Sequence, residues 1–147
     1  MIQRIQTVSI LLAIAGLVVF LFLPFAQGVS PDAGLSIIDL LKPENAKLLF
    51  GVGFMAGIDL AILILLISLF LFKNRPRQYR MISVATLISL LVAGFAAAAM
   101  LIPGIGLPLL NHPVALAFPP VSILFLLLAN RQIKKDEQLV RSVDRIR

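Results

Sequence analysis

The sequence contains no cysteine, and this absence excludes several kinds of site at once. Without a thiol the chain forms no disulfide, binds no metal through thiolates and carries no lipid on a cysteine side chain. Histidine is nearly absent too, since His112 is the only one. It lies in a proline-rich segment with no acidic residue close by in sequence, so we interpret it as a solvated side chain. No cofactor or metal is therefore predicted.

Charged residues are also scarce. They make up 14% of the 147 residues, whereas a soluble domain carries about a quarter, and hydrophobic residues make up 60%. A net charge of +6 is sometimes a sign of nucleic-acid binding. Here the basic residues flank long apolar runs instead, so no nucleic-acid partner is expected.

Four apolar runs organise the chain. They cover residues 7–26, 48–72, 81–102 and 114–130. A helix rises 1.5 Å per residue, so runs of about 17–25 residues cross a hydrocarbon core of about 30 Å. Backbone polar groups in lipid must bond internally, which favours helices. We predict an all-α membrane protein with four transmembrane helices in residues 1–130, followed by a charged tail, residues 131–147.

The first run is too long for the apolar part of a signal peptide, and Pro24 stands where a cleavage site needs a small residue. We therefore expect it to remain as a membrane span.

The fourth run contains a pair of prolines, Pro119 and Pro120. They either kink the helix or mark its regular start, with "VALAF" entering irregularly.

Almost all basic residues lie before the first run, between the second and third runs, or after the fourth run. Only Lys42 and Lys47 lie between the first two runs. By the positive-inside rule both termini and the segment "KNRPRQYR" (73–80) are cytoplasmic. Basic residues near a membrane surface also attract anionic lipid, at about 1 kcal/mol each. The residues predicted for this topology and lipid role are Lys73, Arg75, Arg77 and Arg80. On the outer side, "LSIIDLL" (35–41) is a candidate for a brief interfacial helix.

Small residues predict close helix packing. Gly53 and Gly57 form a Gly-x-x-x-Gly pair, and Gly94 and Ala98 give a similar pair in the third run. Such pairs let helix backbones approach in lipid. Packing within the chain is the main expectation, and a homo-oligomer seam is the alternative.

Asp59 is out of place near the middle of the second run. A carboxylate at bilayer depth costs a few kcal/mol, so it is a functional candidate. An ion-coupled carrier would use it as a proton or sodium site. A neutral Asp59 that packs inside the bundle and bonds a hydroxyl or carbonyl satisfies the same physics without transport. The candidate hydroxyl partners are Ser9, Ser83, Thr86 and Ser89.

Motifs of common enzymes are missing. The sequence has no HExxH, GxSxG, P-loop or dinucleotide-binding pattern. Asp32, Asp39 and Glu44 share the segment between the first two runs, but three scattered acids are a weak sign of a metal or glycosidase site. We predict that the protein is not an enzyme.

The tail, residues 131–147, holds more charge than topology needs. As a helix continuing from Asn130, it would align apolar side chains from Leu139 to Ile146 and form pairs such as Glu137–Arg141. Lipid attraction alone does not need acids, whereas mixed charge suits a protein partner. A solvated or lipid-resting helix is the alternative. The predicted partner-binding residues are Lys134, Lys135, Asp136, Glu137, Leu139, Val140, Arg141, Val143, Asp144, Arg145 and Arg147.

Three stretches carry a resemblance to a known family. They are "MIQRIQTV" at the start, "LFLFKNRPRQYR" in the middle and "LANRQIKKDEQLVRSVDRIR" at the end. Together they resemble a family of small four-span bacterial inner-membrane proteins defined by a domain of unknown function. The resemblance implies four helices, cytoplasmic termini and an inner-membrane location, and it implies no activity or ligand.

These features together predict a non-enzymatic accessory or scaffold subunit of the membrane. It would dock a membrane or cytoplasmic protein through an amphipathic tail helix. The competing hypothesis is a small ion-coupled carrier or channel built around Asp59.

Overall fold

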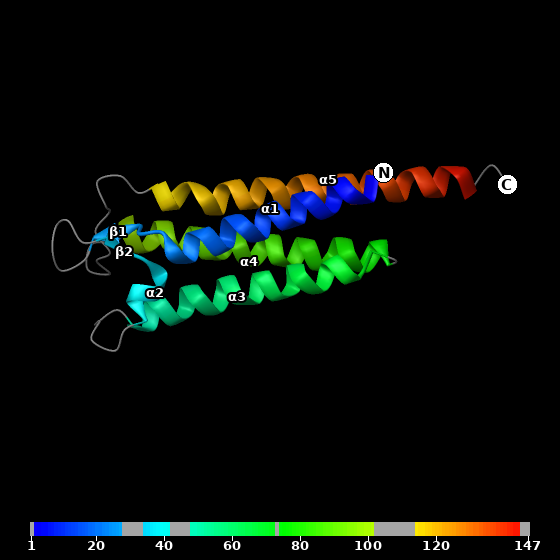
Figure 1. The fold of residues 1–147 in the computed structure, drawn as a ribbon. Coiled ribbons are helices and arrows are strands. Elements are labelled where there is room, and N and C mark those ends of the chain that lie inside the picture. Colours follow the sequence, from blue (N-terminus) through cyan, green and yellow to red (C-terminus); the bar gives the residue numbers. More distant parts are fainter. Residues whose placement is uncertain (1, 28–33, 42–47, 73, 102–113, 145–147) are drawn as a thin grey trace.

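Four long helices form the body of the protein (Figure 1). The computed structural model describes residues 2–27, 34–41, 48–72, 74–101 and 114–144. The helices are α1 (Ile2–Phe22), α3 (Leu48–Phe70), α4 (Arg75–Leu101) and α5 (Phe118–Asp144). Each is long and apolar enough to cross a membrane. The predicted all-α, four-span architecture is confirmed.

The helices pack as a closed ring. α1 lies mainly against α5, α5 against α4, and α4 against α3, while a smaller α1–α3 contact completes the ring. The N-terminus, the α3–α4 turn and the tail lie together at one end of the bundle, which we call the basic end (Figure 1). We call the opposite end the hairpin end. Both termini therefore lie on the same side, as an even number of spans requires.

The hairpin end contains a short two-stranded sheet that the sequence analysis did not predict. α1 stops at Phe22, two residues before Pro24, because the residue before a proline disfavours helical geometry. Ala26–Gln27 (β1) then pairs antiparallel with Gly34–Leu35 (β2). The predicted span end at residue 26 is thus four residues too late.

The predicted interfacial helix is present as α2 (Ile37–Leu40). Ser36 caps it, since its hydroxyl accepts a hydrogen bond from the Asp39 N–H and the Asp39 carboxylate accepts one from the Ser36 N–H. Ile37 and Leu40 are fully buried. Gly51 allows α3 to approach, because a Cβ there would lie 2.9 Å from the Leu40 carbonyl carbon.

The segment 75–80 is helical, so α4 begins six residues before the predicted third run, 81–102. α4 starts at Arg75, with Pro76 in its first turn, where a proline N–H is not needed. The Gln78 side chain is buried and donates to the Ser68 carbonyl oxygen at 3.2 Å. This bond joins α4 to the end of α3 and keeps the turn between them short.

The prolines of the fourth run mark the regular start of a helix, as one of the two hypotheses proposed. Val114–Ala117 forms a single 3₁₀ turn, η1, and α5 follows at Phe118. Pro119 and Pro120 lie in the first turn of α5, where they interrupt no internal hydrogen bond of the helix. α5 then continues without a break through the last span into the tail.

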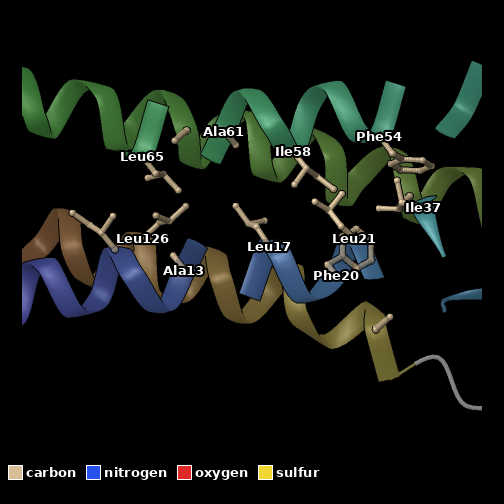
Figure 2. Close-up of a cluster of buried hydrophobic side chains, with 14 of the residues drawn as sticks. Ala13, Leu17, Phe20, Leu21, Ile37, Phe54, Ile58, Ala61, Leu65 and Leu126 are labelled. Carbon is tan, nitrogen blue, oxygen red and sulfur yellow. The ribbon is translucent and has the colours of Figure 1, made fainter. Parts of the chain in front are cut away.

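Buried side chains of all four long helices and of α2 form the core, part of which Figure 2 shows. Leu17 and Leu21 of α1 lie on the side facing Ile58 of α3, and Leu65 of α3 faces Leu126 of α5. Aromatic rings seal the hairpin end, with centroids 5.7 Å apart for Phe20–Phe25, 6.0 Å for Phe25–Phe54 and 5.3 Å for Phe54–Phe95. Many large apolar side chains remain exposed on the outer faces of the helices, as membrane lipid requires.

The two residues of each small-residue pair do not both lie at a close contact between helices. A Cβ at Gly57 would lie 2.6 Å from Val92 Cγ2, so this glycine lets α3 approach α4. A Cβ at Gly53 or Gly94 would meet nothing within 4 Å. Packing within the chain is therefore confirmed for Gly57 and wrong for Gly53 and Gly94.

Candidate functional site: a basic groove and the surfaces around it

A groove of about 570 Å³ opens between α4 and α5 toward the basic end. From α4 it is lined by Tyr79, Ser83 and Thr86, and from α5 by Leu127, Asn130, Arg131 and Lys134. The spacing of three and four residues places each set on one side of its helix. The two sets meet at the base, where the Asn130 amide nitrogen donates to Ser83 Oγ at 3.4 Å.

The cations of this groove have no internal partner among the residues that the structure describes. Arg131 and Lys134 are exposed, and neither forms a hydrogen bond or an ion pair within the part of the chain that the structure describes. None of the residues that line the groove is acidic. The groove therefore presents uncompensated positive charge beside hydroxyl and amide groups, a combination suited to an anion.

An ion pair lies next to the groove and joins two residues that the sequence analysis singled out. Arg75 Nη2 lies 3.1 Å from Asp136 Oδ2, and Arg75 Nη1 donates to the Asp136 carbonyl oxygen at 3.3 Å. The Asp136 side chain is only 12% exposed. Asp136 was predicted to bind a partner, and Arg75 to interact with lipid. The pair holds the start of the tail against α4, and both predicted roles stay predictions.

The structure describes the side chains of the predicted tail surface only as far as Val140. Lys134, Lys135, Leu139 and Val140 are exposed, and Glu137 is half-buried and engaged in a contact of its own. The backbone is helical to Asp144. The side chains of Arg141, Val143 and Asp144, with Arg145 and Arg147, lie outside the described residues.

Asp59 faces outward, which contradicts its interpretation as a packing residue. It lies at the centre of α3, about 16 Å from either helix end at 1.5 Å per residue. The residue is exposed, and no hydrogen bond or ion pair reaches it within the described ranges. The four hydroxyls considered as partners bond elsewhere. Each hydroxyl donates to the backbone carbonyl oxygen four residues earlier in its own helix. The pairs are Ser9 with Ile5, Ser83 with Tyr79, Thr86 with Ile82 and Ser89 with Ala85.

The remaining candidates offer no site in the described structure. Asp39 caps α2, while Asp32, Glu44, Lys73 and His112 lie outside the described residues. Arg77 and Arg80 are exposed near the start of α4. Among the residues described, no group of three His, Cys, Asp or Glu side chains is arranged to hold a metal ion.

The groove itself was missed by the sequence analysis. Its signal was present, since Tyr79, Ser83 and Thr86 share one helical spacing and Asn130, Arg131 and Lys134 share another. The meaning of that signal depends on α4 and α5 being neighbours, which no local pattern states.

A match to a family model then decides the relationship that the three motifs suggested. The model is described as "Domain of unknown function (DUF4293)" and matches residues 2–146. The chain belongs to this family. The DUF4293 match spans all four helices and most of the tail, so the groove, Asp59 and the Arg75–Asp136 pair all lie within the family domain. Neither the comparison with curated proteins nor that with solved structures finds a match.

Proposed function

We propose that this protein is a non-enzymatic accessory or scaffold subunit of an assembly in a bacterial inner membrane. It docks a protein partner through its tail. The observation that carries the proposal is that α5 continues as one helix past the end of the bundle to Asp144 (Figure 1). A preformed helix holds its side chains in place before binding, so less ordering entropy is lost than with a disordered tail.

The chemistry of the projecting helix fits a protein surface. Leu139 is 49% exposed and Val140 is 45% exposed. At 1.5 Å per residue, Val140 lies about 9 Å along α5 beyond Lys134, a residue that lines the groove. Charged residues of both signs surround these two apolar side chains in the sequence. A partner with an apolar centre and a mixed-charge rim would match this surface.

Asp59 supplies a second, independent argument for a partner. A carboxylate at the centre of a span is costly, and this chain forms no hydrogen bond or ion pair with it within the described residues. A hydrogen-bond donor on another protein's helix would remove that cost. The same geometry argues against the competing carrier hypothesis, because Asp59 lies on an outer face and does not line the groove.

The proposed orientation can be tested with single cysteines, which the natural chain lacks. Ala33→Cys, Asn74→Cys and Ser142→Cys place one thiol in each of three segments. A membrane-impermeant thiol reagent applied from outside the inner membrane should label only Ala33→Cys, because both termini and the α3–α4 turn are cytoplasmic in this proposal. Labelling of Ser142→Cys in intact cells would refute a cytoplasmic tail.

The docking role of the tail can be tested by truncation after Glu137, which keeps the Arg75–Asp136 ion pair. The shortened chain retains Arg131, Lys134 and Lys135, so we expect normal insertion and loss of the partner that co-purifies with the full chain in mild detergent. Arg141→Glu with Arg145→Glu should weaken binding more than Val143→Ala. The loss should be partial, since exposed ion pairs contribute about 0.2–1 kcal/mol each.

The matched control is Arg77→Glu with Arg80→Glu, which reverses the same amount of charge at the same end of the bundle but outside the tail. Equal weakening by both double variants would mean diffuse attraction rather than docking. A truncated chain that inserts normally and keeps every partner would leave the tail without a docking role.

A further inference from the structure

The groove between α4 and α5 continues into an apolar surface at its deep end. Thr86 and Leu127 line that end. One helical step further into the bundle, Leu90 follows Thr86 on α4 and Leu124 precedes Leu127 on α5. These two leucines are 55% and 59% exposed. The groove thus grades from cationic and polar at the basic end to apolar toward the middle of the spans.

We propose that this groove binds an anionic phospholipid, with Arg131 and Lys134 holding its phosphate and the acyl chains lying over Leu127, Leu90 and Leu124. The phosphate diester is the chemical group that the two cations select. Guanidinium and ammonium groups both form charge-assisted hydrogen bonds with phosphate oxygens, and the arginine fork can do so through two N–H groups.

The geometry of the groove suits a headgroup in three further respects. Its volume of about 570 Å³ lies in the range of small-molecule sites. Tyr79 lines the α4 wall, and its hydroxyl can bond the polar end of a headgroup. Basic sites between transmembrane helices, at the level where the spans meet the cytoplasmic leaflet, are typical of bound anionic lipids.

The apolar continuation decides between a lipid and a free phosphate ion. A soluble ion would gain nothing from exposed leucines beside its site, whereas acyl chains need them. The cations are also distinct from those that the sequence singled out for lipid attraction, since Arg75 is paired with Asp136 and neither Arg77 nor Arg80 lines the groove. The site shares Lys134 with the predicted partner-binding surface of the tail, but its test does not depend on the docking function.

The test compares two double variants of equal charge in the purified full-length protein. Arg131→Gln with Lys134→Gln removes the groove cations. Arg80→Gln with Lys135→Gln removes two exposed cations beside the groove that do not line it. Binding of phosphatidylglycerol and phosphatidylcholine is measured by native mass spectrometry from detergent. We expect the natural chain to prefer phosphatidylglycerol, and the groove variant to lose at least about tenfold in that preference.

The control variant should retain the affinity of the natural chain. Equal losses in both double variants would overturn the proposal, because diffuse charge would then explain the binding. Equal binding of the two lipids to the natural chain would overturn it as well. Inorganic phosphate at matched concentration should not displace phosphatidylglycerol, and displacement by it would assign the groove to a free anion.

A second variant keeps the charges and fills the apolar end. Leu127→Trp places a large ring where the acyl chains are expected to lie. We expect it to weaken phosphatidylglycerol retention while leaving both cations in place. Unchanged retention would show that the deep end of the groove is not part of the site, and would overturn the lipid assignment.

Discussion

Gly16→Ala is expected to destabilise the bundle by about 1–3 kcal/mol, the usual cost of overpacking a close contact. A Cβ at Gly16 would overlap Ser122 Oγ, where α1 packs against α5. Ser122 is fully buried, so its side chain cannot turn outward into solvent, and its hydroxyl has no hydrogen-bond partner within the described residues. Stability can be followed by the thiol reactivity of a Ser89→Cys reporter during denaturation, because Ser89 is buried in α4.

Ser122→Ala should rescue Gly16→Ala. Once the hydroxyl is removed, the nearest neighbour of the new Cβ is the Cβ of residue 122 at 3.5 Å, an ordinary contact. Ser122→Ala alone should cost little, since the hydroxyl is unbonded. The matched control is Gly53→Ala, where the added Cβ meets nothing within 4 Å and alanine is favoured in helices by up to about 1 kcal/mol. If Gly16→Ala is as stable as Gly53→Ala, the close α1–α5 approach is wrong.

Asp59→Leu is expected to improve membrane insertion and to weaken the partner complex. It removes a carboxylate whose placement at a helix centre costs about 2.5–3.5 kcal/mol on insertion scales. A polar contact between transmembrane helices contributes about 0.6–2 kcal/mol, so the complex should weaken by roughly 3- to 30-fold. Asp59→Asn should lose less, because an amide keeps the hydrogen bond. Both effects can be measured as the amount of chain inserted and the amount of partner retained in mild detergent.

The mirror control is Leu87→Asp, which puts a new carboxylate on an exposed position of α4. It should reduce insertion without affecting the partner, since only the face around Asp59 is proposed to be covered. The carrier hypothesis gives the opposite pattern. In that case Asp59→Asn and Asp59→Leu would abolish biological activity equally while the complex stays intact.

The sequence by itself determined the number of spans, their helical nature and the continuity of the tail with the fourth span. A bilayer demands about 20 apolar residues with an internally bonded backbone, so composition along the chain is sufficient for these features. The stretch "LSIIDLL" also predicted α2, and the structure adds that Ser36 and Asp39, three positions apart, cap it.

Only the tertiary structure decided which face of each helix points inward. In a soluble helix the apolar stripe marks the buried side, but both sides of a membrane span are apolar, and the pattern carries no such information. For this reason Asp59 was expected to pack inside and lies outside, and Gly57 and Gly53 separate into a packed and an open position. The Arg75–Asp136 ion pair and the basic groove likewise join residues of α4 and α5 that are far apart in sequence. Their chemistry exists only because the ring order of the bundle makes those two helices neighbours.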